Sequence, residues 1–155
     1  MNTIELEHFL PYRMNRIATA VSRRFRRVYG DRIGLSIPEW RVLATLGQYG
    51  TSTAKDIGRH SDMHKTKVSR AVAELERRRW LKRQTNLDDR REELLTLTAE
   101  GRRTYANLVP GMLALERELL GGLGPDTTEG LMAALQNLER VLGLHRAARS
   151  RTAAD

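Results

Sequence analysis

Residues 61–98, SDMHKTKVSRAVAELERRRWLKRQTNLDDRREELLTLT, decide the fold of this chain of 155 residues. After a turn, the pattern over 64–79 is that of a helix, because Val68, Val72 and Leu75 recur at i, i+4 and i+7 and so share one face. Apolar residues at this spacing face a protein core. The remaining positions are polar and basic, so the spacing predicts a helix with one side buried and the other open to solvent.

The solvent face of this helix is suited to a DNA major groove. Arginine and lysine pair with guanine acceptors, threonine and serine bond base edges or phosphates, and a small residue permits close approach. The face comprises Thr66, Arg70, Ala73 and Arg77, flanked by Lys67 and Ser69. The alternative is an ordinary solvated face that happens to be basic.

A β-hairpin is predicted directly after this helix. Residues 81–85 and 93–98 have strand-like composition, and the polar segment 86–90 between them favours a turn. Arg90 and Arg91 lie near the tip of the hairpin, and arginine on a thin ribbon fits the narrow, negative minor groove. The alternative is a solvated turn whose ion pairs contribute little to stability.

The preceding residues complete a helix-turn-helix. Ser36 and Glu39 have the spacing of a capping box, which predicts the start of one helix. A short helix over 53–60 follows, and a tight turn separates it from the helix at 64–79. In a helix-turn-helix the second helix reads the DNA. With the basic hairpin as a wing, we expect residues 35–101 to form a DNA-binding lobe.

Two apolar stripes lie outside this lobe. They run at helical spacing from Leu10 to Val28 and from Leu131 to Leu142. Exposed stripes of this length are a liability in a monomer, so burial against a second copy is the economical solution. We therefore expect a homodimer, with an intramolecular helix pair as the alternative.

The predicted fold class is mainly α, a winged helix-turn-helix with a small β-hairpin wing and dimerisation helices at both ends. We expect four parts. They are an N-terminal dimerisation helix at 1–34, the DNA-binding lobe at 35–101, C-terminal dimerisation helices at 102–145 and a frayed tail at 146–155.

Composition and charge narrow the class of protein. The net charge is +8, and residues 64–91 alone contribute a surplus of +6, which favours a nucleic-acid partner at that place. Cysteine is absent, which excludes disulfides, thiolate metal sites and thiol redox sensing. No apolar run approaches the roughly 18 residues of a membrane span, and the start lacks a signal-peptide pattern. We expect a cytoplasmic protein with no membrane partner.

Six short stretches of the sequence, taken together with the spacing between them, form a specific pattern. They are Trp40-Arg41-Val42-Leu43, Lys65-Thr66-Lys67-Val68-Ser69-Arg70, Leu75-Glu76-Arg77-Arg78, Trp80-Leu81, Asp89-Arg90-Arg91 and Leu97-Thr98-Ala99-Glu100-Gly101. Together, residues 36–105 resemble the MarR (multiple-antibiotic-resistance regulator) family of winged-helix repressors. The last two stretches match the D-x-R and L-T-x-x-G signature of that family's wing. The flanking helices also match in number and length, so the resemblance covers nearly the whole chain.

The resemblance implies a dimer whose two winged lobes straddle a pseudo-palindromic site on double-stranded DNA. Arg91, beside Arg90, is then the minor-groove residue, and Asp89 is its partner. The residues expected at the major groove and phosphates are Lys65, Thr66, Lys67, Ser69 and Arg70. Repression is the usual mode of the family. His64 departs from the Ser or Asp helix cap of many relatives, which leaves the cap chemistry open.

The resemblance also implies a small-molecule effector site between the dimerisation helices and the lobe. An aromatic wall beside guanidinium groups suits an aromatic carboxylate, and the candidates are Tyr12, Arg13, Arg16 and Trp40. A second cluster suits phosphates and therefore an acyl-coenzyme A thioester: Arg23, Arg24, Arg26 and Arg27. The alternatives are that Trp40 is core, Tyr12 a dimer contact and the arginines a solvated helix face.

Two other classes of function are alternatives to a specific regulator. An enzyme is not expected, because the sequence has no Gly-rich phosphate loop, nucleophile elbow or triad. His60 and His64 have metal-ligand spacing, but a turn falls between them, so neither a metal nor a cofactor is expected. A sequence-indifferent architectural DNA-binding protein is the alternative, and it differs from a regulator in binding any duplex equally.

Overall fold

The computed structural model describes residues 3–144 of the chain, and the tail predicted at 146–155 lies outside them. Within that range the chain forms six helices and three short strands. In order they are α1 (Leu10–Ile33), α2 (Ile37–Tyr49), β1 (Ser52–Thr53), α3 (Ala54–Ser61), α4 (Lys65–Arg77), β2 (Leu81–Thr85), β3 (Glu93–Leu97), α5 (Ala99–Gly121) and α6 (Pro125–Val141). The predicted mainly α winged-helix fold is confirmed.

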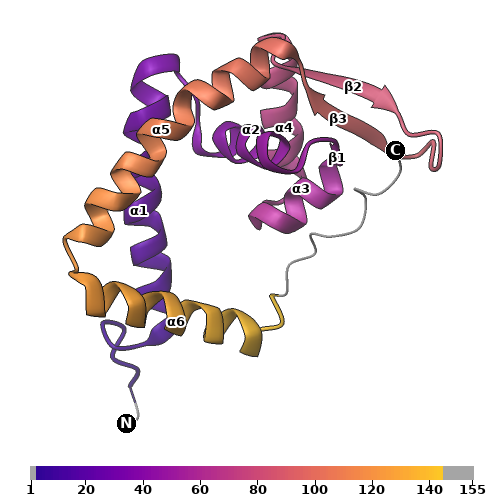
Figure 1. Ribbon diagram of the computed structural model, residues 1–155. Coiled ribbons are helices and arrows are strands. Elements are labelled where there is room, and N and C mark those ends of the chain that lie inside the picture. The colour runs from indigo at the N-terminus through magenta and orange to yellow at the C-terminus, as the bar shows by residue number, and fades with distance from the viewer. Residues whose placement is uncertain (1–2, 145–155) are drawn as a thin grey trace.

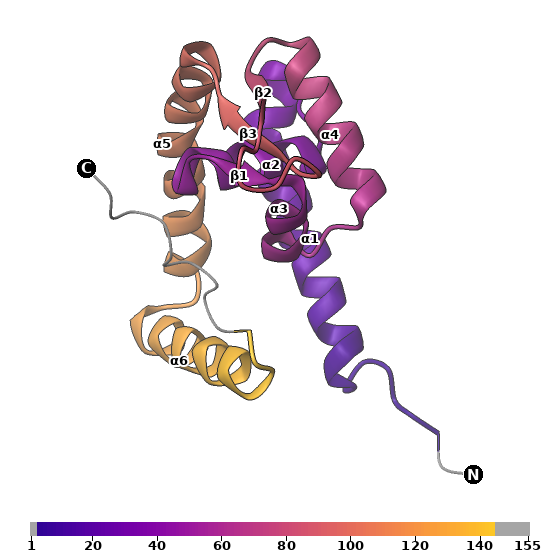
Figure 2. The same ribbon diagram turned by 90° about the vertical axis from the view of Figure 1, so that its right-hand side faces the viewer.

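The three short helices and the sheet gather into one lobe, and the long helices extend away from it (Figure 1). The β2–β3 hairpin projects from the lobe on the side away from α1 and α5. α6 crosses α1 in Figure 1, but the view turned by 90° in Figure 2 separates the two helices. The two views together show that α1 and α6 do not lie side by side.

The first two helices begin and end at residues that satisfy their free backbone groups. α1 ends at Gly34, whose φ of 65° places it in the left-handed region and lets its amide donate to the Gly30 carbonyl. α2 begins with the predicted capping box, in which the Ser36 amide donates to the Glu39 carboxylate and the Glu39 amide to the Ser36 hydroxyl.

The helix-turn-helix forms where it was predicted. The Thr53 hydroxyl accepts a hydrogen bond from the Asp56 amide and caps α3, and Asp62 makes the turn with a φ of 49°. His64, the unusual residue at the start of α4, acts as the cap itself: its Nδ1 accepts from the Thr66 amide at 3.3 Å. α4 ends two residues before the predicted Arg79, which has a φ of 61°.

The predicted hairpin is confirmed and belongs to a three-stranded antiparallel sheet in the order β1-β3-β2. Leu81 pairs with Leu97 at its base and Thr85 with Glu93 near its tip. β1 was not predicted, because two residues are too few to show an alternating pattern.

The core of the protein lies in the lobe. Val68, Val72 and Leu75 are buried on one face of α4, as their spacing predicted. They pack with side chains of α2, α3, β2 and β3, which are Val42, Leu43, Leu46, Ile57, Leu81, Leu95 and Leu97. The opposite face of α4 is left exposed.

The last two helices differ in how they start. Thr98 caps α5 as predicted, since its hydroxyl accepts from the Gly101 amide. The sequence pattern also predicts that Asp126 and Glu129 cap α6, and this is wrong. α6 begins after Gly124 without a side-chain cap: Pro125, whose fixed φ suits the first helical position, starts the helix before Asp126, so Asp126 lies inside the first turn. No residue of α6 is buried in the single chain.

Candidate nucleic-acid interface

The exposed face of α4 carries all five residues that the sequence places at the major groove. They are Lys65, Thr66, Lys67, Ser69 and Arg70, and all are exposed. Within residues 3–144, no ion pair or side-chain hydrogen bond engages Lys65, Lys67 or Arg70. These cations are held by a rigid helix and have no protein partner in the described part of the chain.

The tip of the hairpin presents two further exposed cations, Arg90 and Arg91, and has a defined shape. The buried Asn86 accepts the Asp88 amide through its side-chain oxygen at 3.1 Å. The Asp89 carboxylate accepts the backbone amide of Arg91 at 3.0 Å. Asp89 is thus a partner of Arg91, as the resemblance implies, and the contact that it makes is to the backbone amide.

A bridge between the hairpin and α4 was not predicted. Arg83 on β2 donates through Nε to Glu76 on α4 at 2.9 Å and through a terminal nitrogen to Glu93 on β3 at 2.8 Å. These hydrogen bonds, first that to Glu93 and then that to Glu76, raise the pKa of the Arg83 guanidinium. The bridge links the base of the hairpin to α4 and so joins the two elements that carry the exposed cations.

A second ionic cluster lies at the end of α4. Glu74 accepts hydrogen bonds from both Arg77 and Arg78, which lower its pKa from 4.5 to about 2. Basic residues at the end of a helix also favour its dipole. Arg77, Arg78 and Arg83 are thus engaged within the protein, unlike Arg70, Arg90 and Arg91.

The four residues predicted for an effector are not brought together within one chain. Tyr12, Arg13 and Arg16 are exposed near the start of α1, with the Arg16 guanidinium 5.8 Å from the centre of the Tyr12 ring. Trp40 is half-buried and stacks on Tyr29, at 5.2 Å between ring centres. Since α1 rises about 1.5 Å per residue, roughly 25 Å separates Tyr12 from Tyr29 and its neighbour Trp40.

The stack at Trp40 joins three helices. Tyr29 of α1 lies on one face of the indole, and Tyr105 of α5 lies on the other at 6.2 Å. Burial raises the pKa of the Tyr29 hydroxyl, against the opposing influence of Arg41 and Arg26. The stack supports the alternative interpretation of Trp40 as part of the core.

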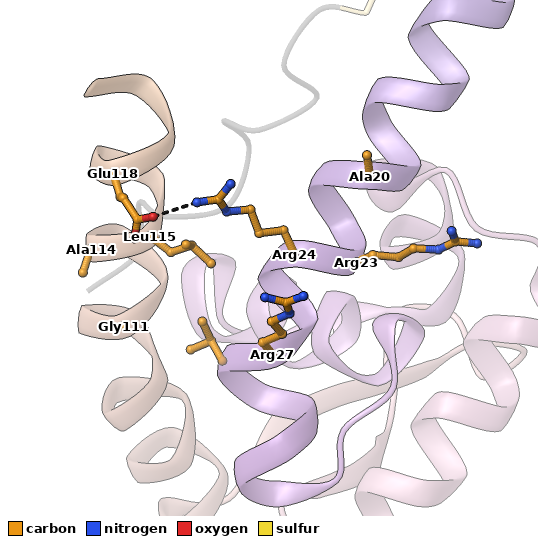
Figure 3. Close-up of a pocket in the computed structure, with 9 residues that line it drawn as sticks. Ala20, Arg23, Arg24, Arg27, Gly111, Ala114, Leu115 and Glu118 are labelled. Carbon is orange, nitrogen blue, oxygen red and sulfur yellow. Dashed lines mark hydrogen bonds and ion pairs between the residues drawn. The ribbon is translucent and has the colours of Figure 1, made fainter. Parts of the chain in front are cut away.

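An open cleft of about 880 Å³ lies between α1 and α5. Its cationic residues belong to the second arginine cluster that the sequence analysis identifies. Figure 3 shows Arg24 reaching across the cleft to Glu118, a contact of 2.7 Å. Arg23 extends away from α5, and Arg27 does not reach Glu118. The cleft is lined by Ala20, Arg23, Arg24, Arg27, Val28, Gly111, Ala114, Leu115 and Glu118.

Other kinds of site find no support in the described residues. Within 3–144, no group of three His, Cys, Asp or Glu residues is placed to hold a metal ion. His60 packs edge-on against Tyr49, and His64 is the cap of α4. None of the helices in this range combines the length and apolar character that crossing a bilayer requires.

A helix-turn-helix with a basic wing, carried between long flanking helices, defines a winged-helix DNA-binding protein. A sequence model of the MarR family matches residues 33–92, which run from the end of α1 to the hairpin. The match agrees with the predicted resemblance: this part of the chain is similar to MarR-family transcriptional regulators.

Other proteins of known sequence or structure are similar to this chain over most of its length. The HTH-type transcriptional regulator YwoH of Bacillus subtilis is 28% identical over 120 residues, which cover 77% of this chain and 86% of YwoH. A MarR-family regulator from Silicibacter pomeroyi is 27% identical with a TM-score of 0.74, over 92% of this chain and 96% of that one. BpsR of Bordetella bronchiseptica, whose DNA binding is regulated by 6-hydroxynicotinic acid, has a TM-score of 0.76 at 21% identity, over 89% and 98% of the two chains.

Proposed function

We propose that two copies of this chain form a cytoplasmic homodimer that binds a pseudo-palindromic operator and represses transcription until a small anionic effector releases it. The observation that carries the proposal is the set of unpaired cations shared by α4 and the hairpin tip. DNA phosphates are neutralised by exposed lysine and arginine side chains, and the cations of α4 and the hairpin tip are exposed and have no carboxylate partner in the described residues. Arginines already paired with carboxylates are less available to phosphates.

The proposed contacts fall into two groups. α4 enters the major groove, and Arg90 and Arg91 follow the adjacent minor groove from the wing. Asp89 acts indirectly, by ordering the backbone of the wing tip. The contacts of α4 are made by Lys65, Thr66, Lys67, Ser69 and Arg70.

The proposed dimer accounts for the apolar surface of the outer helices, which are α1, α5 and α6. Leu10 and Ile17 on α1 are more than half exposed, and Leu131 and Met132 are exposed on α6. Apolar patches that one chain leaves open are covered in a symmetric dimer. We accordingly divide the chain into dimerisation helices at 1–34 and 102–145 and a DNA-binding lobe at 35–101.

The cleft between α1 and α5 supports an anionic effector. Arg27 lines the cleft and has no carboxylate partner among the described residues, so it can meet the carboxylate or phosphate of an effector. Arg24 is already paired with Glu118. A small aromatic acid, such as the 6-hydroxynicotinic acid that regulates BpsR, or an aromatic acyl-coenzyme A thioester has the required charge. The residues Tyr12, Arg13 and Arg16 share a site with Trp40 only if a partner chain supplies them.

The experiment that tests DNA recognition is fluorescence anisotropy on the duplex directly upstream of the protein's own gene and on a scrambled duplex, across a salt series. We expect a preference of about a thousandfold and a steep salt dependence. Equal binding to both duplexes would instead support the architectural alternative, and no binding to either would contradict both functions.

The effector is tested by titrating 6-hydroxynicotinic acid and benzoyl-coenzyme A into the protein–DNA complex. We expect release of DNA by one of them and loss of that release in Arg27→Gln. Arg117→Gln is the matched control, because Arg117 lies on α5 outside the cleft. Equal responses of the two variants would contradict the placement of the effector.

A further inference from the structure

The end of α1 is joined to the end of α4 by one side chain. The last carbonyls of a helix have no partner within the helix. The amides of Gly34 and Leu35 fold back onto Gly30 and Tyr29, which leaves the carbonyls of Ile33 and Gly34 still to be satisfied. Arg78, directly after α4, donates to both, at 2.7 Å and 3.1 Å.

The guanidinium of Arg78 is held in place from its own side as well. Its Nε donates to the Glu74 carboxylate at 2.8 Å, one turn back on α4. Its planar group lies 5.2 Å from the centre of the Trp80 ring. The side chain is about one fifth exposed, so water competes weakly for these bonds. The rigid fork of an arginine, bonded on both sides, fixes direction as well as distance.

This contact is distinctive among the polar contacts of α1. Within residues 3–144, the other side-chain hydrogen bond or ion pair that ties α1 to a different helix is that of Arg24 with Glu118, on α5. The hydrogen bonds of Arg78 connect the end of α1 with the end of the recognition helix α4. Arg78 therefore adds a directional polar link between the end of α4 and the end of α1 to the apolar core that Tyr29 shares with α4.

We infer that Arg78 is a positioning residue for operator recognition: it holds α4 against α1 and so sets the spacing and rotation of the two recognition helices in the dimer. The inference rests on the proposed function, because spacing has meaning only for two lobes on one duplex. Adding one base pair between half-sites moves them apart by about 3.4 Å and rotates one by about 34°. A rigid link penalises that change, and a loosened link tolerates it.

The test measures spacing preference and not affinity alone. An operator duplex is first selected from a random pool with the wild-type protein, and versions with one or two base pairs added at or removed from its centre are prepared. The dissociation constant of each duplex, and of an isolated half-site, is measured by anisotropy. We expect Arg78→Met to lose at least about fivefold of the wild-type discrimination between spacings, while half-site affinity stays unchanged.

Two further variants keep the test sharp. Arg77→Met is the matched control, since Arg77 also bonds Glu74 but does not contact α1. We expect Arg77→Met to lower the affinity for all duplexes by the same factor, so that the ratios between the dissociation constants of different spacings stay unchanged. Arg78→Lys keeps the charge but loses the fork, and we expect a discrimination between those of wild type and Arg78→Met. Arg78→Lys carries the test if Arg78→Met does not fold in thermal melts.

The outcomes separate the inference from the function beneath it. A flattened spacing profile in the Arg78 variants, with Arg77→Met like wild type, supports the inference. A wild-type profile in Arg78→Met overturns the inference and leaves the regulator intact. A wild-type protein that itself ignores spacing overturns the proposed dimeric recognition together with the inference.

Discussion

The lobe and the outer helices contain similar apolar residues and bury them very differently. Leu43, Ile57 and Leu75 in the lobe are inaccessible to solvent within a single chain. Leu10 and Ile17 on α1 are 55% and 56% exposed, and α6 has no buried residue. The lobe completes its core within one chain, with Tyr29 of α1 and Leu108 of α5 packed into it. The exposed parts of α1 and α6 present a surface that the proposed second copy would cover.

This difference predicts two kinds of stability. Substitutions in the lobe core lower stability by an amount that does not depend on protein concentration. Substitutions on the outer helices act through association, so their effect changes with concentration by mass action. The following predictions test or refine this contrast, in descending order of expected effect.

Leu135→Asp on α6 is expected to have the largest effect. Each dimer would bury two uncompensated carboxylates, which costs about 5 kcal/mol or more in the free energy of association. Sedimentation across a concentration series measures it, and we expect a monomer with an intact lobe. Asn137→Asp is the matched control, since it places the same charge on the opposite face of α6 beside Arg140. Equal dimerisation of the two variants would remove α6 from the interface.

Leu75→Ala in the lobe core is expected to lower the free energy of unfolding by about 2–5 kcal/mol, through lost burial and a residual cavity. Denaturant unfolding at several protein concentrations measures it. Leu87→Ala, at an 85% exposed position on the hairpin, should change stability by less than about 0.5 kcal/mol. A cost for Leu75→Ala that varied with concentration would contradict a lobe that is complete in one chain.

Arg91→Ala at the wing tip is expected to weaken operator binding by about 1–3 kcal/mol and leave the dimer folded. Anisotropy on the upstream duplex measures the loss. Arg103→Ala removes the same charge from an exposed position on α5, outside the proposed interface, and should bind nearly as the wild type does. Unchanged affinity in Arg91→Ala would contradict the assignment of the wing.

The smallest expected effect is a pH dependence of stability that arises from Glu74. Hydrogen bonds from Arg77 and Arg78 lower its pKa from 4.5 to about 2. The stabilisation is therefore complete above pH 4.5 and is lost as the pH falls toward 2. Glu74→Gln should flatten this part of the profile of melting temperature against pH. An unchanged slope in the variant would show that other groups dominate acid unfolding.

Most of the fold was predictable from local patterns. The spacing of Val68, Val72 and Leu75, the capping box at Ser36 and the turn before Arg90 each carry a local physical cause, and each feature forms as predicted. The start of α6 was predicted wrongly, because Pro125 is itself a start signal and begins the helix before Asp126, which then lies in the first turn and not at the cap.

The candidate site was less accessible to sequence reasoning, because a sequence does not show which cations are paired. Arg70, Arg78 and Arg83 have the same charge, yet Arg78 and Arg83 are engaged by carboxylates or backbone carbonyls from distant residues. The sequence places Trp40 and Tyr12 in one candidate effector site, but the length of α1 separates the two residues in a single chain. Long-range contacts decide such roles, and they exist only once the chain has folded.

The central claim is that the outer helices join two copies so that two lobes read one palindrome. The most direct measurement is the mass of the protein–DNA complex, by sedimentation, on the selected palindromic duplex and on its isolated half-site. The account predicts two chains per palindromic duplex and at least about hundredfold weaker binding to the half-site, because two linked lobes bind cooperatively. One chain per duplex, with equal affinity for both, would contradict it.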